Sequence, residues 1–291
     1  MSIPFPKRPA LWVSAMAAQS LRKADGTQAT ADGDLVRTWR DLSGNGMDLS
    51  IFQNPHPFAN MGGTGGVDVD VPLKVAAGVR SLNYASRGAS TAAMSRFAPP
   101  TDVVLTGTAG EQFIRLKCLA APQTTYNRAP IGISGYYNSY LNTEYMGSTL
   151  IRWRGWHSDR VDYTPSAPEK ATLTTWHTMG LVSDPGYKEL RINGVSVSSS
   201  NTNTFFAGGE SYNAQHPDWR IPQFIFGGCN RNGGSGFAGE VSDVVLFLEP
   251  LTNPERVQVE AVLAAMQAAA TDLWTDAPDT RTDTLGFTVA A

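Results

Sequence analysis

The chain has 291 residues, 42% of them hydrophobic, and a formal net charge of −3 with only 17% charged residues. This apolar content suffices for a packed core, and the lack of a basic run excludes a protein that binds nucleic acid by neutralising its phosphates. No segment approaches the roughly 18 apolar residues of a membrane span, and residues 1–9 contain no stretch like a signal peptide. We therefore expect a protein made without a leader, whose partners include neither nucleic acid nor a membrane.

The first predicted elements are short strands and a turn. Leu11-Trp12 and residues 36–39 are rich in β-branched and aromatic residues, as strands are. The run Arg40-Asp-Leu-Ser-Gly-Asn-Gly46 follows and predicts a turn in which Gly44 and Gly46 take left-handed conformations.

A further strand is predicted where the sequence Val67-Asp-Val-Asp-Val71 alternates strictly between apolar and acidic residues. The alternation places Asp68 and Asp70 together on its solvent-facing side. Additional strands are predicted at residues 112–119, 149–153, 175–182 and 224–226.

A hairpin is predicted within Leu190-Arg-Ile-Asn-Gly-Val-Ser-Val197, because Asn193-Gly194 favours the positive φ angles of a two-residue turn. The two cysteines, Cys118 and Cys229, both fall in predicted strands, Cys118 on the face shared with Ile114 and Leu116. Two buried reduced thiols and a disulfide that closes a loop of about 110 residues are both open at this point.

The C-terminal part predicts a buried strand followed by a helix. Residues 241–248 form a β-branched and aromatic run bounded by glycines and a proline. Asn253 is a good N-cap and Pro254 suits the first helical position, so we expect one amphipathic helix at about 254–268. Its apolar stripe consists of Val259, Val262, Leu263 and Met266, with Glu255, Arg256, Gln258 and Glu260 placed elsewhere.

Three of these segments together resemble the concanavalin A-like lectin/glucanase superfamily, specifically its laminin G-like and pentraxin-like branch. They are the opening around Trp39 to Gly46, the Asn-Gly-Val hairpin at 193–195, and Phe237-Ala-Gly-Glu-Val-Ser-Asp-Val244. The resemblance covers roughly residues 10 to 267 and implies an all-β, two-sheet antiparallel jelly-roll sandwich with one short C-terminal amphipathic helix. This fold is used by lectins, glycosidases, adhesion modules and phage virion proteins alike.

The domain organisation expected from the sequence is simple. Residues 1–9 form an N-terminal arm, residues 10–270 the concanavalin A-like sandwich, and residues 271–291 a tail. Because the tail is polar and irregular with an apolar end, we expect it to dock on a partner.

The sequence contains no clear catalytic pair. A retaining glycosidase needs two carboxyl groups about 5 to 5.5 Å apart, and the Glu-x-Asp-x-x-Glu string of the superfamily's glucanases is absent. Asp68 and Asp70 have no glutamate near them, and strand alternation puts Glu240 and Asp243 on opposite faces. We therefore predict that the protein is not an enzyme.

Metal sites and cofactors are not expected either. The four histidines are scattered, at positions 56, 157, 177 and 216, and zinc-ligand spacing is absent. Calcium is conceivable at Asp32-Gly-Asp34 or in the loop Asp41 to Gly46, but aspartates in turns usually accept hydrogen bonds from nearby backbone.

One constellation indicates binding, because it concentrates aromatic rings, arginines and small polar groups in about twenty residues. Rings stack on sugar faces, and tyrosine, tryptophan and arginine also dominate protein–protein hot spots. Core packing, an assembly interface and a glycan platform are all open for this cluster. The candidate residues are Tyr136, Tyr137, Tyr140, Tyr145, Arg152, Arg154, Trp156 and His157.

The function expected from these observations is a non-enzymatic structural protein of a tailed-phage virion, a decoration, tail or fibre component that acts through protein–protein contacts. Its low charge resembles an interface composition. Other virion proteins and further copies of itself are the expected partners, and the virion, assembled in the host cytoplasm, is the expected location. The alternative is a lectin-like module that attaches to host or cell-surface glycans, and the third is a glycoside hydrolase.

Overall fold

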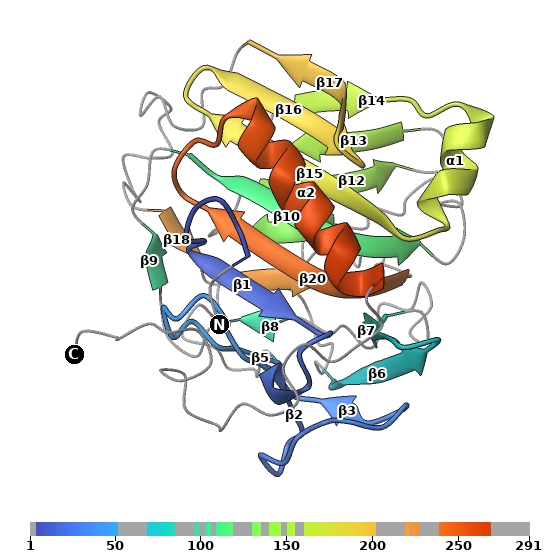
Figure 1. The fold of residues 1–291 in the computed structure, drawn as a ribbon. Helices are drawn as coiled ribbons and strands as arrows, with labels where there is room; N and C mark the ends of the chain where they lie inside the picture. The colour runs from blue at the N-terminus through green and yellow to red at the C-terminus, as the bar shows by residue number, and fades with distance from the viewer. Residues whose placement is uncertain are drawn as a thin grey trace, which may run out of the picture.

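The computed structural model describes residues 4–51, 69–84, 97–98, 103–105, 109–118, 130–134, 140–146, 150–154, 160–201, 219–221, 223–226 and 239–268. These residues form two antiparallel sheets that pack face to face, with β10 near β11 and β12 near β15 (Figure 1). The predicted all-β sandwich is confirmed. In the described part of the chain, no helix is long and apolar enough to cross a membrane.

The first sheet, sheet A, carries α2 on its outer face. Its strand order is β17 (Val195–Ser200), β16 (Tyr187–Ile192), β15 (His177–Asp184), β10 (Glu111–Cys118), β20 (Gly239–Phe247), β7 (Val79–Asn83), β6 (Val71–Ala76) and β3 (Leu35–Val36), with β1 (Leu11–Ser14) also paired to β20.

The second sheet, sheet B, has the order β14 (Arg160–Tyr163), β13 (Leu150–Arg154), β12 (Tyr140–Met146), β11 (Pro130–Ser134), β19 (Gln223–Phe226), β8 (Phe97–Ala98), β5 (Leu49–Ile51), β4 (Thr38–Trp39) and β2 (Leu21–Arg22). A small separate pair joins β18 (Trp219–Ile221) to β9 (Val103–Leu105). The short 3₁₀ helix η1 spans Ala18–Ser20.

Strand β20 is buried along its whole length, which explains its continuous apolar run. One face, with Val244 and Leu246, contributes to the main core between the sheets, where Cys118 also lies with Ile114 and Leu116 as predicted. The other face, with Val245 and Phe247, packs in a second cluster beneath α2. Phe5 from the N-terminal arm joins that second cluster, with its ring 5.1 Å from Trp12 and 6.2 Å from Phe247. Cys229 lies outside the described residues.

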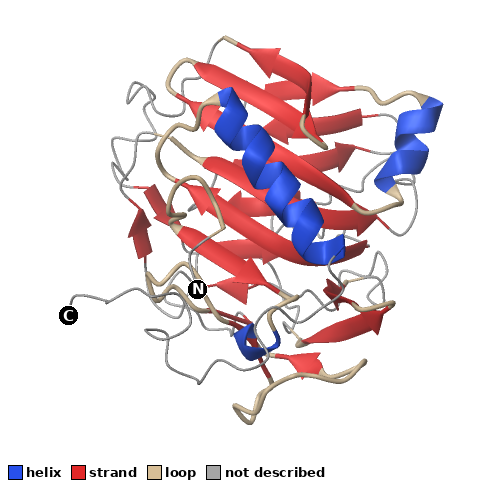
Figure 2. Ribbon diagram, in the orientation of Figure 1, coloured by secondary structure: helices blue, strands red, loops and turns tan. Residues whose placement is uncertain are grey.

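Helix α2 (Asn253–Ala268) confirms the predicted C-terminal helix and crosses the outer face of sheet A (Figure 2). Val259, Leu263 and Met266 are buried against the sheet, as the apolar stripe predicts. The predicted N-cap is wrong by one residue, because Thr252 and Glu255 form the capping box. Thr252 N–H donates to Glu255 Oε2 at 2.7 Å, and Glu255 N–H donates to Thr252 Oγ1 at 3.4 Å.

The hairpin between β16 and β17 is confirmed, with φ of 49° at Asn193 and 83° at Gly194. A second helix, α1 (Ala167–Leu173), connects β14 to β15 and was not predicted. Its signal was present, since Ser166 and Glu169 have capping-box spacing and Ser166 N–H donates to Glu169 Oε2 at 2.7 Å.

The strand predicted at residues 67–71 is not formed at residues 69 and 70. Strand β6 begins at Val71, where the predicted strand was to end, and Asp68 lies outside the described residues. Asp70 is not a free solvent-facing charge, because its carboxylate pairs with the Arg37 guanidinium and its side chain is only 11% exposed. The predicted left-handed glycines, Gly44 and Gly46, are confirmed with φ of 84° and 75°.

Candidate functional site

The predicted aromatic and arginine cluster falls on two neighbouring strands of sheet B. Tyr140 and Tyr145 belong to β12, and Arg152 and Arg154 belong to β13. The two strands pair antiparallel, so Arg152 stands opposite Glu144, Arg154 opposite Asn142, and Tyr145 opposite Ile151. By strand alternation, Tyr140, Arg152 and Arg154 share one face of this strand pair, and Tyr145 falls on the opposite face. Tyr136, Tyr137, Trp156 and His157 lie outside the described residues, and that half of the cluster stays a prediction.

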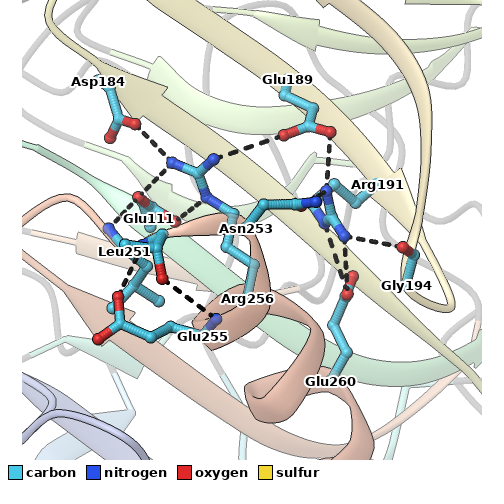
Figure 3. A network of polar contacts seen from close by, with 11 residues as sticks. Glu111, Asp184, Glu189, Arg191, Gly194, Leu251, Asn253, Glu255, Arg256 and Glu260 are labelled. Carbon is cyan, nitrogen blue, oxygen red and sulfur yellow. Dashed lines mark hydrogen bonds and ion pairs between the residues drawn. The ribbon is translucent and has the colours of Figure 1, made fainter.

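The most extensive polar arrangement in the described residues lies instead on the outer face of sheet A, beneath the first half of α2 (Figure 3). Arg256 of α2 donates to Glu111 of β10 from both Nε and Nη2, each at 2.8 Å. Its Nη2 also donates to Asp184 Oδ2 at 2.5 Å. The Glu111 side chain is fully buried, and it accepts a third hydrogen bond from Leu251 N–H at 2.7 Å.

A second arginine extends this arrangement to the hairpin. Arg191 of β16 donates from Nη1 to Glu189 Oε1 at 2.8 Å and to Asn253 Oδ1 at 3.0 Å. Its Nη2 donates to the Gly194 carbonyl at 2.7 Å and approaches Glu260 Oε2 at 3.4 Å. The two arginines therefore tie α2 to β10, β15, β16 and the β16–β17 turn. We call these six charged residues the latch cluster: Glu111, Asp184, Glu189, Arg191, Arg256 and Glu260.

The latch cluster corrects the predicted helix surface. The sequence predicts Arg256 and Glu260 away from the buried apolar stripe, but both residues are buried, with 7% and 3% of their surfaces exposed. They are four residues apart and therefore share a helix face. The sequence does contain a signal for this burial. Glu189 and Arg191 are two residues apart and therefore share one face of their strand, and their charges complement those of Arg256 and Glu260.

The electrostatics of the latch cluster are dominated by burial. Four carboxylates surround two guanidinium groups, and the side chains are at most 14% exposed. Burial raises the pKa of Glu111 to about 7, although the hydrogen bonds from Arg256 act in the opposite direction. Burial also raises the pKa of Asp184 and that of Glu260. The arrangement favours uptake of protons over loss of them.

A second polar group on the same face lies near the C-terminal end of α2. Arg115 of β10 donates to Gln267 Oε1 at 2.9 Å and to Thr178 Oγ1 at 3.2 Å. Asp243 of β20 stands opposite Arg115 and is fully buried, and burial raises its pKa to about 6. Burial lowers the pKa of His177 to about 4, so this histidine is a neutral structural residue.

The predicted separation of Glu240 and Asp243 is wrong. The register between β10 and β20 shifts after Arg115, so Asp243 faces Arg115 while Glu240 faces Lys117, two positions along β10. The bulge therefore places both carboxylates on one face. Neither is available to a substrate, because Asp243 is buried and Glu240 binds Lys117 Nζ at 3.0 Å and accepts from Ser81 Oγ at 2.8 Å.

In the two candidate calcium segments, the aspartate carboxylates accept hydrogen bonds from backbone N–H groups. Asp41 accepts hydrogen bonds from Trp12 N–H at 3.1 Å and Met47 N–H at 3.0 Å. Asp34 Oδ2 accepts from Thr30 N–H at 2.7 Å and Ala31 N–H at 2.9 Å. Within the described ranges, no set of three or more His, Cys, Asp or Glu side chains is placed to hold a metal ion.

Comparison with solved structures shows what this fold is similar to. A Trypanosoma rangeli sialidase in complex with sialic acid shares 12% identity at a TM-score of 0.52, over 88% of this chain and 33% of the sialidase. The binding domain of botulinum neurotoxin serotype D shares 11% identity at a TM-score of 0.52, over 88% of this chain and 51% of that one. The receptor binding domain of botulinum neurotoxin D gives 12% identity and a TM-score of 0.50, over 88% and 53%.

This chain thus spans between one third and about half of the length of these structures. At such low identity, the similarity shows a shared β-sandwich fold and nothing finer. No protein family matches the sequence, and no characterised protein matches it either.

Proposed function

We propose that the chain is a lectin-like, non-enzymatic binding module whose target is a glycan, and that β12 and β13 carry the binding surface. The observation that carries the proposal is the pairing of these strands, which places Tyr140, Arg152 and Arg154 on one face of sheet B. Tyrosine rings stack on sugar faces, and an arginine guanidinium binds a carboxylate through two parallel hydrogen bonds. The target we favour is therefore an acidic glycan.

The position of α2 on sheet A supports a binding surface on sheet B. Helix α2 lies over β10 and β15 on the outer face of sheet A, and the charged groups beneath its first half are engaged in the latch cluster (Figure 3). A ligand would have to displace the helix to reach it. The fold is similar to that of a sialidase solved with sialic acid and to that of a toxin's receptor binding domain. This analogy of fold supports an acidic glycan as the target.

The non-enzymatic part of the proposal rests on how the described carboxylates are used. Glu240 is bound by Lys117 and Ser81, Asp243 is buried, and Glu111 accepts three hydrogen bonds. An acid and nucleophile pair needs two carboxyl groups that a substrate can reach. These three do not offer one.

The test is a titration of the protein with an oligosaccharide that ends in sialic acid, followed by calorimetry. Arg152→Ala should weaken binding at least tenfold, which corresponds to about 1.4 kcal/mol, because a guanidinium–carboxylate contact is lost. Arg8→Ala is the matched control, since it removes the same charge from an exposed position and should leave binding unchanged. Equal binding by both variants and the wild type contradicts the proposed surface.

A second candidate function is a structural protein of a tailed-phage virion that uses the same strands as an assembly interface. It is favoured by composition, since only 17% of residues are charged and charged residues are depleted at interface centres. Light scattering of the protein with its assembly partners distinguishes the two. An interface variant changes the particle size, whereas a glycan-site variant does not.

A further inference from the structure

Two carboxyl groups of the latch cluster are held by a single nitrogen atom. Arg256 Nη2 lies 2.8 Å from Glu111 Oε1 and 2.5 Å from Asp184 Oδ2. The two carboxyl groups therefore approach each other across this nitrogen. Two buried carboxylates this close repel when both are ionised, so the pair titrates as a unit that favours one shared proton.

The surrounding charges strengthen this preference. Within the latch cluster, four ionised carboxylates face two guanidinium groups, which leaves a net charge of about −2 on side chains that are at most 14% exposed. Such an excess is costly at low dielectric, and proton uptake relieves it. The titratable groups that face the pair are Arg256 and Glu260 from α2, and Tyr187, Glu189 and Arg191 from β16.

We propose that α2 is a proton-controlled latch, in which one proton taken up by the Glu111–Asp184 pair tightens the helix on sheet A and loss of that proton loosens it. The pair is suited to this role because α2 supplies Arg256, which binds both carboxyl groups. Lifting the helix would also expose the aromatic residues beneath it, Trp12, Phe113 and Phe247. The latch thus controls access to an apolar face of the sandwich.

The pH range follows from the direction of the shift. Burial raises the pKa of Glu111 from its ordinary 4.5 to about 7, and the pKa of Asp184 rises as well. The closed state therefore binds more protons than a solvated open state between these values, and its advantage falls as pH rises through that range. Between pH 6.0 and pH 8.5, a shift of this size changes the opening equilibrium about tenfold.

Hydrogen exchange of the full-length protein, with rates corrected for their intrinsic pH dependence, tests the latch. We expect the protection factors of α2 amides to be about tenfold higher at pH 6.0 than at pH 8.5. Amides of β10 and β20 should change much less, because opening of α2 leaves the strand ladder intact. Equal protection of α2 at the two pH values would overturn the proposal.

Glu111→Gln isolates the pair, because burial of Glu111 is the main cause of its raised pKa and the amide stays neutral at every pH. The pH-dependent change in α2 protection should fall below about threefold in this variant. Asp243→Asn is the control, since it removes another buried carboxylate from the same face and should retain most of the tenfold change. If Glu111→Gln does not fold, Glu111→Leu combined with Arg256→Met removes the same titrating group. A full tenfold change in either variant shows that the proton binds elsewhere and refutes the latch.

Discussion

Replacing Arg256 with methionine is the sharpest perturbation of this fold, because the residue provides the cation for a fully buried glutamate. The change removes two 2.8 Å hydrogen bonds to Glu111 and the 2.5 Å contact with Asp184, while methionine keeps most of the buried volume. Removing one partner of a buried ion pair typically costs about 3 to 5 kcal/mol, since the other charge is left uncompensated. At roughly 2 to 4 °C per kcal/mol, we expect the melting temperature to fall by about 10 °C.

Denaturant unfolding followed by tryptophan fluorescence measures this cost directly. Arg37→Met is the matched control, because Arg37 pairs with Asp70 at a site where its side chain is 32% exposed, and such pairs contribute about 0 to 1 kcal/mol. Adding Glu111→Leu to Arg256→Met should recover much of the lost stability, since no unpaired glutamate remains. A loss of less than about 1 kcal/mol for Arg256→Met would refute the reasoning about the latch cluster.

Three further predictions address the helix cap, the aromatic cluster and catalysis. Thr252→Ala should destabilise the protein by about 1 kcal/mol in the same unfolding assay, because Glu255 N–H loses its side-chain acceptor, and no loss would show that the capping box is inert. Trp156→Ala should abolish glycan binding with an unchanged melting temperature, whereas weaker assembly by about 2 kcal/mol would favour the virion interface and a lower melting temperature would assign Trp156 to the core. The purified protein should release no reducing sugar from β-glucans, and turnover that Asp70→Asn abolishes would contradict a non-enzymatic module.

Local signals were sufficient for the elements whose stability is local. Asn193-Gly194 predicts the β16–β17 hairpin because few residues adopt positive φ at both turn positions. The apolar run of β20 and the 3.6-residue stripe of α2 likewise predict strand and helix. The aromatic and arginine positions were found by their density in the sequence, and the pairing of β12 with β13 then places four of them on one sheet.

Features that depend on residues distant in the sequence escaped prediction. Helical periodicity alone assigns Arg256 and Glu260 to a solvated helix face. Their partners Glu111 and Arg191, which bury them, are 145 and 69 residues away in the sequence. The bulge in β20 that brings Glu240 and Asp243 to one face has no signal of its own in the sequence. The Thr252 cap was missed because Asn253 is an equally good capping residue, and Asn253 instead accepts from Arg191.

The most direct test of the account is the affinity of the full-length protein for a sialic acid-terminated oligosaccharide, measured by calorimetry on the wild type, Arg152→Ala and Arg8→Ala. A binding module on β12 and β13 predicts saturable binding by the wild type and by Arg8→Ala, and a loss of at least tenfold, or about 1.4 kcal/mol, in Arg152→Ala. No saturable binding by the wild type, or equal affinity in all three proteins, would contradict it.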